Sequence, residues 1–491
     1  MSRLLVAAIA TGLLGGCAVG PDFKSPAPPQ VSGYSKETLP PRVGSAHAEV
    51  QQLVAGMDIP GQWWTLFHST ALNELVGEAL QKNPTVAAAQ AALRAANENT
   101  AAQGGTYFPG VQADYAFSRQ RNPVGTLSPT LSSGASIFNL HTAQVSVSYV
   151  FDVFGANRRQ VESLQAQADS QHYQLEATYL TLASNVVTAA IQEAALRAQI
   201  AATNDIVRSE REAAEILGHQ YELGSIAGTD VMAQEAALAA AEATLPPLQK
   251  QLAQQRHLLT ALAGRFPDEE PGAEFELSAL MLPQDLPVSL PAQLVRQRPD
   301  VLAAEAQMHA ASAAVGVAIA NLLPQVTLTA SEGGTSTVLG NLLASGNTFW
   351  TAGAGLTQTL FAGGALVHRK RAADAALDAA GAQYRAVVLA AFQNVADSLT
   401  ALRSDADAVN ASYTAERAAA SSLEVVRHNL QLGSVSYLAV LNAEQTYQQA
   451  TLALVQARAS RFADTAALLQ ALGGGWWNLR SATAATPGTP P

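Results

Sequence analysis

The 491-residue chain has one cysteine, Cys17, and few charged or aromatic residues. A lone cysteine cannot form a disulfide within the chain, so it must have a different role. Charged residues make up 14% of the chain and the net charge is −11, which argues against nucleic-acid binding, because that function needs a basic surface. After residue 17 there is no unbroken run of 18 apolar residues, so the sequence predicts no transmembrane helix.

The sequence also lacks the motifs of common enzymes. None of its nine histidines forms a His-x-x-x-His pair or another metal-ligand spacing, and no phosphate-binding loop is present. Gly433-Ser434-Val435-Ser436 lacks the second glycine of a nucleophile elbow and sits at a helix turn, where serine is a common cap. We therefore expect neither an enzyme nor a metal site, and no cofactor.

The N-terminus has the pattern of a bacterial secretory signal. A short basic start is followed by an apolar run at residues 4–14 and by Gly15-Gly16 before Cys17. Leu14-Gly15-Gly16-Cys17 fits the lipoprotein box, in which residues 1–16 are removed and the cysteine carries covalent N-acyl and diacylglycerol lipid. Ala18, where Asp would favour retention at the inner membrane, indicates a lipid anchor in the outer membrane of a Gram-negative bacterium.

The rest of the chain contains an internal duplication. Asn83-Pro84 matches Arg298-Pro299 at an offset of 215, and Gly224 matches Gly433 at an offset of 209. Such a long period indicates a duplicated half rather than a solenoid. We predict a lipidated extended segment at residues 17–62, rich in Pro, Ser and Gly, two structural repeats at 63–285 and 286–477, and a flexible tail at 478–491.

Both repeats show the same order of elements. An alanine-rich helix is expected at about 72–102 and 292–321. A β-hairpin follows within 110–152 (strands at about 111–121 and 142–151) and within 325–361 (strands at about 325–335 and 349–361). Long helices come next, within 156–264 and 365–472, and their apolar residues show the heptad spacing of a coiled coil. Pro246-Pro247 is expected to kink or break one of them.

The strands alternate between apolar and polar residues, as in Val145, Val147 and Tyr149 against Gln144 and Ser146. This pattern suits both a transmembrane barrel with a wet interior and a half-buried sheet of a soluble domain. The lipoprotein box and the long helices favour the barrel, and the aromatic residues near the strand ends suit its interfacial girdle: Tyr107, Phe108, Phe349 and Phe361. Because four strands cannot close a membrane barrel, at least two chains must share it.

Several motifs, taken together with their order and spacing, resemble the TolC-like outer-membrane efflux proteins, in particular the NodT-type lipoproteins. The resemblance implies a mainly α-helical homotrimer with a shared 12-stranded β-barrel and coiled-coil helices that form a periplasmic α-barrel. It also implies an exit duct for drugs or other small toxic compounds, joined by a periplasmic adaptor (membrane-fusion) protein to an inner-membrane pump of the RND type. The motifs are Leu14-Gly15-Gly16-Cys17-Ala18-Val19-Gly20-Pro21-Asp22-Phe23, Trp63-Trp64-Thr65-Leu66-Phe67, Arg298-Pro299-Asp300-Val301, Tyr221-Glu222-Leu223-Gly224, Leu432-Gly433-Ser434-Val435-Ser436-Tyr437-Leu438 and Ala471-Leu472-Gly473-Gly474-Gly475-Trp476.

The resemblance also implies which residues meet the partners and the cargo. The adaptor would contact the turns between long helices, at Tyr221, Gly224, Ser225, Leu430, Gly433 and Ser434. The periplasmic aperture would be lined by Asp230, Leu438 and Asn442.

Related proteins often place an acid at the position of Asn442, and a residue at the position of Leu430 that ties the closed aperture to the acid at Asp230. Here neither Leu430 nor Val435 can be that partner. Asp230 corresponds to Ala439, and Asn442 to Ala233, so we expect the two turns of a chain to differ in gating.

Two other functions fit the sequence less well. One is the outer-membrane duct of a type I protein secretion system, which would use the same architecture for a protein cargo. The other is a non-conducting coiled-coil lipoprotein that spaces the cell envelope.

Overall fold

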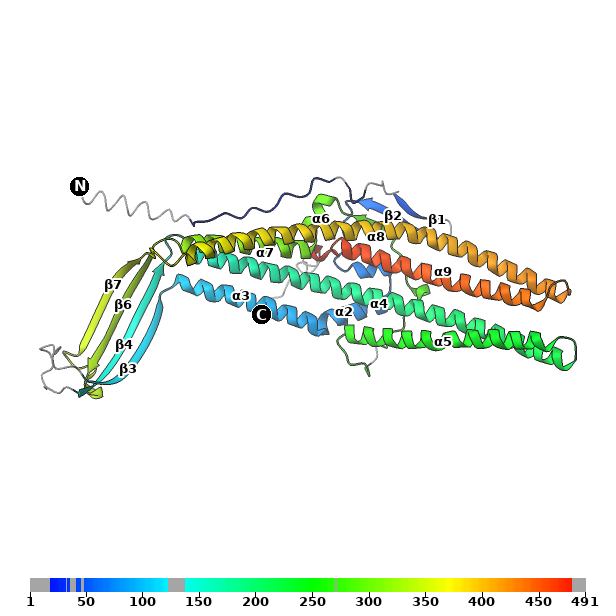
Figure 1. The fold of residues 1–491 in the computed structure, drawn as a ribbon, viewed down its shortest axis with the longest axis horizontal. Coiled ribbons are helices and arrows are strands. Elements are labelled where there is room, and N and C mark those ends of the chain that lie inside the picture. The colour runs from blue at the N-terminus through cyan, green and yellow to red at the C-terminus, as the bar shows by residue number, and fades with distance from the viewer. Residues whose placement is uncertain are drawn as a thin grey trace, which may run out of the picture. The chain divides into compact units, whose positions relative to one another are not determined.

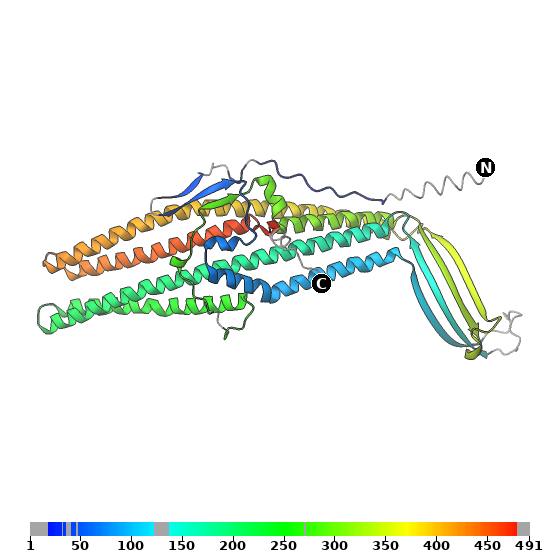
Figure 2. The same cartoon turned by 180° about the vertical axis from the view of Figure 1, so that it is seen from behind.

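The computed structural model describes residues 18–31, 33–35, 41–45, 48–121, 137–269 and 272–478. The chain forms two compact units. The first comprises Met1–Pro26, Leu93–Gln171 and Ala304–Tyr384, and the second comprises Ala27–Ala92, His172–Ala303 and Arg385–Pro491. Two helices, α4 (Ala156–Glu222) and α8 (Ala365–Gln431), run without interruption from the first unit into the second (Figures 1 and 2).

The same elements occur in the same order in each half of the chain. The first half contains α2 (Thr70–Lys82), α3 (Pro84–Gly104), β3 (Gly110–Arg121), β4 (Ile137–Phe151), α4 and α5 (Gly228–Leu262). The second half contains α6 (Pro291–Gln297), α7 (Pro299–Ala320), β6 (Gln325–Ser336), β7 (Thr348–Thr357), α8 and α9 (Tyr437–Ala471). The fold is thus mainly helical, with four long strands.

The first helix of each half was predicted as one element, and this was wrong. The helix breaks at Asn83 in the first half and at Arg298 in the second, where the backbone is extended with ψ of 126° and 123°. Each of these residues precedes a proline, whose ring disfavours the α conformation at the residue before it.

Two further predictions need correction. Of the kink or break predicted at Pro246-Pro247, the break does not occur, because α5 is continuous across both residues. The prolines remove two backbone donors, but the neighbouring residues 242–244 are exposed, so water can satisfy the freed carbonyl groups. The predicted strand at 349–361 ends earlier, at Thr357. There the chain leaves the sheet, and the Gln358 side chain donates to the Leu322 carbonyl at 3.0 Å.

A small second sheet was not predicted. It consists of β1 (Arg42–Ser45), β2 (Ala48–Ala55) and β5 (Asp285–Val288), in the order β1-β2-β5. Part of the segment predicted to be extended therefore pairs with a strand more than 230 residues away along the chain. The fully buried Gln51 holds the sheet in place, because its amide donates to the Pro283 carbonyl at 3.1 Å and its oxygen accepts from Arg461 of α9 at 3.3 Å.

Among the described residues, α7 alone is long and apolar enough to be a candidate membrane span, with a mean hydropathy of 1.2 over 18 residues. Its contacts are those of a packed helix. Ser163 of α4 donates to the Ala310 carbonyl at 2.9 Å, and His309 bonds to Glu162 of α4 at 2.9 Å. Gly316 lies so close to Arg159 that a side chain there would meet its Cγ at 2.9 Å.

The duplication extends to individual contacts in the second unit. The Asn83 side chain donates to the Leu262 carbonyl at 2.9 Å, and Arg298 donates to the Ala471 carbonyl at 2.9 Å. In both halves, therefore, the side chain of the residue before the proline caps the C-terminal end of the last helix of that half, α5 or α9. The glycine that follows this helix has positive φ, 78° at Gly264 and 99° at Gly473, and passes close to the end of the short helix α2 or α6.

These contacts predict that Gly264 tolerates substitution far less well than the turn glycine Gly224. In Gly264→Ala, the Cβ would lie 2.6 Å from the Lys82 carbonyl oxygen. Gly224, with φ of 72°, has nothing within 4 Å of a Cβ, so Gly224→Ala incurs only the backbone penalty. We expect a loss of about 1–2 kcal/mol in the free energy of unfolding for Gly224→Ala, and roughly 1–3 kcal/mol more for Gly264→Ala. Thermal unfolding of the two variants measures this, and equal losses would contradict it.

Candidate functional site

The four long strands form one antiparallel sheet in the order β3-β4-β6-β7 within the first unit (Figures 1 and 2). The register aligns apolar residues with apolar residues across all four strands. Val111 pairs with Val147, Val147 with Ala330, and Ala330 with Ala352. Polar residues align in the same way one position along: Gln112 pairs with Ser146, Ser146 with Ser331, and Ser331 with Thr351.

The sheet therefore has one apolar face and one polar face, and the apolar face is open. Val111, Trp350 and Leu356 are 67%, 75% and 71% exposed. A soluble sheet would cover such residues, whereas a barrel in a membrane turns them to lipid and turns the polar face to a wet lumen. Glu332, between Val145 and Trp350 in the register, is a charged exception on the apolar face.

Both edges of the sheet are open. Within the described part of the chain, β3 pairs only with β4, and β7 pairs only with β6. Unpaired strand edges cannot remain in lipid, because their backbone N–H and C=O groups would have no hydrogen-bond partner there. The sheet is therefore a fragment that other chains must complete.

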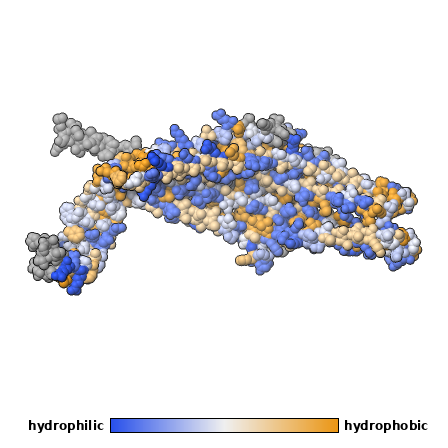
Figure 3. Space-filling model, in the orientation of Figure 1, coloured by the Kyte–Doolittle hydropathy of each residue, from blue (hydrophilic) through white to orange (hydrophobic). Residues whose placement is uncertain are grey.

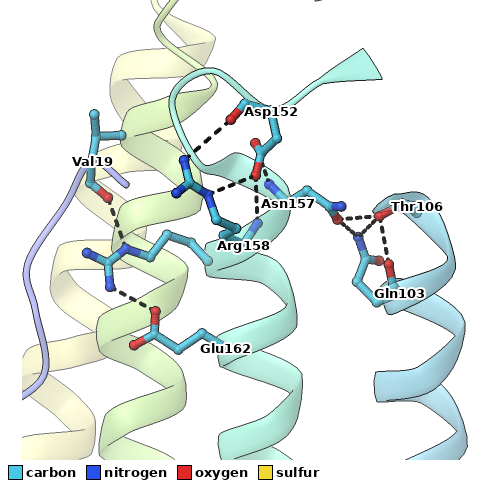
Figure 4. A network of polar contacts seen from close by, with 8 residues as sticks. Val19, Gln103, Thr106, Asp152, Asn157, Arg158 and Glu162 are labelled. Carbon is cyan, nitrogen blue, oxygen red and sulfur yellow. Dashed lines mark hydrogen bonds and ion pairs between the residues drawn. The ribbon is translucent and has the colours of Figure 1, made fainter. Parts of the chain in front are cut away.

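A polar network fixes the point where β4 leads into α4 (Figure 4). The Asp152 carboxylate accepts hydrogen bonds from the backbone N–H groups of Asn157 at 3.0 Å and Arg158 at 2.9 Å, so it caps the first turn of α4. Asn157 in turn accepts hydrogen bonds from Gln103, at 2.6 Å, and from Thr106. The end of α3 is thereby joined to the start of α4.

The segment that follows Cys17 is bound to the same helix start. Arg159, whose side chain is 6% exposed, donates to the Val19 carbonyl at 3.1 Å and pairs with Asp22 at 2.7 Å (Figure 4 shows the contact with Val19). Phe23 stacks on His309 of α7 with a centroid distance of 4.4 Å. Cys17 itself, predicted to carry the lipid, lies outside the described residues.

The predicted adaptor-contact residues lie at two turns with the same backbone geometry, in the second unit. Gly224 and Gly433 have φ of 72° and 71°. The next residue, Ser225 or Ser434, donates its N–H to the carbonyl five residues earlier, at 2.9 and 3.0 Å. Tyr221 is 54% exposed, whereas its counterpart Leu430 is half-buried.

The predicted aperture residues lie in the first two turns of α5 and α9. Asp230 lies in the first turn of α5 and is half-buried. Leu438 and Asn442, four residues apart on the same face of α9, are both exposed, Leu438 at 61%. Among the described residues, the Asp230 carboxylate forms no ion pair within the chain, and its part in the aperture stays a prediction.

Sequence reasoning missed a buried network that joins the two long hairpins, α4 with α5 and α8 with α9. Its centre is Gln234 of α5, which is fully buried. The Gln234 amide donates to the Glu210 carboxylate and to the Glu210 carbonyl, both at 2.7 Å, and its oxygen accepts from the Tyr437 hydroxyl at 2.5 Å. Gln448 of α9 also donates to the Glu210 carboxylate, at 2.9 Å.

An ion pair next to this network connects α8 to the other three helices of the two hairpins. Arg427 of α8 donates to Glu444 of α9 at 2.8 Å and to Ser209 of α4 at 3.1 Å. Burial raises the pKa of Glu444 despite this partner. At an offset of 209, the counterparts of Glu210, Arg427 and Tyr437 are Ala419, Gly218 and Gly228. The duplication gave no signal for the network because these residues occur in one half only.

Two acidic side chains meet elsewhere on the α8–α9 hairpin. Asp405 of α8 lies beside Asp464 of α9, and one oxygen of its carboxyl group is buried without a hydrogen-bond partner. Burial, followed by the interaction with Asp464, raises the pKa of Asp405 to about 7, although the nearby Arg461 opposes this shift. A carboxyl group with a raised pKa holds a proton that the unfolded chain has already released.

Comparison with known proteins decides the family. Residues 75–265 and 290–474 match the outer membrane efflux protein family. The chain belongs to this family. The two matched ranges correspond to the two halves described above, and the family assignment confirms the fold class and the efflux function predicted from the sequence.

Individual relatives agree along nearly the whole chain. Toluene efflux pump outer membrane protein TtgC from Pseudomonas putida is 28% identical over 475 residues, 96% of each chain. Nodulation protein T from Rhizobium leguminosarum bv. viciae is 27% identical over 480 residues, 96% of this chain and 93% of its own length.

Solved structures show the same architecture. The outer-membrane channel OprN has a TM-score of 0.82 and 25% identity, covering 94% of this chain and 100% of its own. The outer membrane protein VceC from Vibrio cholerae has a TM-score of 0.78 and 27% identity, covering 85% of this chain and 100% of its own. This efflux protein is thus a channel of the outer membrane, in agreement with the predicted location.

The Asp405–Asp464 pair predicts a pH dependence of stability. The protonated form of Asp405 stabilises the fold, so its contribution is complete below about pH 4 and is lost as the pH rises through about 7. We expect Asp405→Asn, which stays neutral, to raise the free energy of unfolding at pH 8 by about 1–3 kcal/mol, and to have little effect at pH 4. Thermal melting between pH 4 and 8 tests this. Asp407→Asn, at an exposed position two residues away, is the matched control, and a parallel response in both variants would refute the prediction.

Proposed function

We propose that three copies of this chain form the exit duct of a tripartite efflux pump. The observation that carries the proposal is the four-stranded sheet with one exposed apolar face, one polar face and two open edges. A membrane barrel needs at least about eight strands, and three copies supply twelve. Each copy adds two 67-residue helices, α4 and α8, which are about 100 Å long and exceed the hydrocarbon thickness of a membrane severalfold.

The turns at Gly224 and Gly433 are the proposed docking points of a periplasmic adaptor. Leu223 and Leu432, directly before the two glycines, are 83% and 68% exposed. Apolar side chains at the ends of two helical hairpins suit a partner that buries them. An inner-membrane pump of the RND type would supply the energy, and small toxic compounds are the proposed cargo, in keeping with the toluene efflux pump named for one relative.

The lumen would narrow at Asp230, Leu438 and Asn442. In this proposal the network around Gln234 keeps the duct closed, because it fixes the α4–α5 hairpin against the α8–α9 hairpin just beyond the turns. Opening must separate these hairpins and expose Glu210 and Gln234, which are 3% and 0% exposed. The network thus takes the place of the link at Asp230 that the sequence lacks.

The lipid anchor remains part of the proposal. Cys17 would carry N-acyl and diacylglycerol lipid, with no other cofactor. The residues after it are held by Arg159 in the first turn of α4, which follows closely on the end of β4. This contact supports an anchor that inserts beside the barrel.

Single-channel recording in planar bilayers tests the duct. We expect the purified protein to conduct, and Tyr437→Phe to shift the closed–open balance about fivefold per chain towards opening, because the variant loses the hydrogen bond to Gln234. Tyr447→Phe on the same helix is the control, with no expected change. A protein that inserts but never conducts would support the envelope-spacer alternative instead.

A second variant tests the aperture. Asn442→Asp adds a carboxylate to the proposed constriction in every copy, so block of the channel by Mg²⁺ and selectivity for cations should increase. Ala233→Asp adds the same charge at the duplicated position on α5 and should have the smaller effect. If the two variants conduct alike, Asn442 does not line the constriction.

A further inference from the structure

The last residues of β3 include two arginines, Arg119 and Arg121. The strand begins soon after α3, so these residues lie at the end of the sheet that is farthest from the helices. Both side chains are exposed, and among the described residues neither forms an ion pair. Only two other side chains of the four long strands are charged at neutral pH, Asp114 and Glu332. Figure 3 shows strongly hydrophilic surface at this end of the sheet.

The strand register places both arginines on the apolar face of the sheet. Side chains alternate along a strand, so Arg119 and Arg121 share a face with Val111. Arg119 pairs with Asn139 of β4, on the same face on which Val111 pairs with Val147. The proposed barrel turns this face to lipid. Pairing of the β3 edge with another chain takes place in the plane of the sheet and does not cover the face.

An aromatic cluster precedes the arginines on this face. The Tyr115 hydroxyl is hydrogen-bonded to Nδ1 of His141 at 2.9 Å, and Phe117 packs against the same imidazole with a centroid distance of 4.9 Å. Tyr115 and Phe117 are 57% and 56% exposed. Aromatic side chains on the outer face of a membrane barrel form a girdle at the boundary between hydrocarbon and water. The cluster therefore marks this boundary on β3.

The length of the strand gives the same depth. Counted from Val111, Arg119 and Arg121 are eight and ten residues further along β3, which corresponds to about 26 and 33 Å of strand. For a strand tilted by about 40°, these lengths span about 20 and 25 Å along the membrane normal. The apolar band of a membrane barrel is about 25 Å tall. Both guanidinium groups thus lie where the band ends, on the side opposite the helices.

The acid on the apolar face is too far away to neutralise the two arginines. Glu332 of β6 pairs with Val145 of β4, whereas Arg119 pairs with Asn139 of the same strand. These two levels are six residues apart along β4, or about 20 Å.

A neighbouring copy supplies no acid either. In a closed ring of three copies, the β3 edge pairs with β7 of the next copy, and β7 contains no charged residue. The two connections at this end of the sheet, residues 122–136 and 337–347, also have no charged residue in their sequences. The partner of the arginines must therefore come from outside the protein.

We propose that Arg119 and Arg121 bind phosphate groups of the anionic glycolipid in the outer leaflet of the outer membrane. A guanidinium group matches the geometry of a phosphate and can bind it with two parallel hydrogen bonds. The two side chains stand about 7 Å apart along one face, so they can hold neighbouring phosphate groups. Tyr115 and Phe117 contact the acyl chains just below. Basic residues next to a membrane-embedded element attract anionic lipid in this way.

The site occurs once per copy. At an offset of 215, Arg119 and Arg121 correspond to Gly334 and Ser336 of β6, so the second hairpin lacks the pair. The site rests on the proposed barrel but not on its cargo, its adaptor or its aperture. A protein that conducts but shows no preference for phosphorylated glycolipid would reject the site and leave the proposed duct intact.

Native mass spectrometry of the full-length protein, assembled in detergent, tests the site. One sample receives lipid A with two phosphate groups, a second receives lipid A without phosphate, and a third receives phosphatidylglycerol. We expect the wild type to retain the phosphorylated lipid A in preference to the other two. Arg119→Gln with Arg121→Gln should weaken that retention about 25-fold, or about fivefold for each guanidinium. The matched control, Arg385→Gln with Arg417→Gln, removes two exposed arginines from α8 and should bind like the wild type.

A relocation variant separates the face from the charge itself. Adding Ser118→Arg and Gln120→Arg to the double glutamine variant restores both charges at the same level but on the polar face. This variant should bind lipid A as weakly as the double glutamine variant. Arg119→Lys with Arg121→Lys keeps the charge on the apolar face and should retain most of the binding. Single-channel recording checks that each variant forms a barrel, and the glutamine and lysine variants should keep wild-type conductance.

Four results would each overturn the proposal. Two concern the wild type: equal retention of the two forms of lipid A, or retention of phosphatidylglycerol as strong as that of phosphorylated lipid A. The others are an equal loss in the Arg385 and Arg417 control, and wild-type retention by the relocation variant.

Discussion

The need to satisfy backbone hydrogen bonds in lipid governs the rest of this structure. The β3 and β7 edges carry N–H and C=O groups that have no partner in a single chain, and hydrocarbon supplies none. Pairing with strands of other chains therefore decides whether the sheet can enter the membrane at all. The four long strands depend on a barrel that one chain cannot make.

Much of the fold could be predicted because it follows from local patterns. The alternation in Gln144–Phe151 is visible in the sequence, and the register places those same residues on two opposite faces. The heptads of α4 and α8 and the positive-φ glycines at 224 and 433 are likewise local signals. The β1-β2-β5 sheet was missed because its parallel pairing joins segments that nothing in either local sequence connects.

The buried polar contacts were harder to predict. Gln234 and Tyr437 lie 203 residues apart, and a glutamine on a helix is usually exposed, so only the packing of four helices reveals its role. Arg159 was likewise unremarkable in the sequence, although Asp22-Phe23, quoted for the family resemblance, is its partner segment. The two halves share their backbone plan and differ in their polar side chains, so duplication predicts the scaffold but not the contacts that distinguish one turn from the other.

The continuity of α4 and α8 has a mechanical consequence. Neither helix contains a proline, whereas the Pro246-Pro247 pair lies in α5, a returning helix. Within the second unit, α4 runs from His172 to Glu222 and α8 from Arg385 to Gln431, so each contributes about 70–75 Å of helix without a proline. A tilt of about 5° at the start of either stretch displaces its turn by about 6 Å, because the displacement grows with the length of the helix. A small change in helix angle within this unit therefore becomes a movement of several ångströms at the turn.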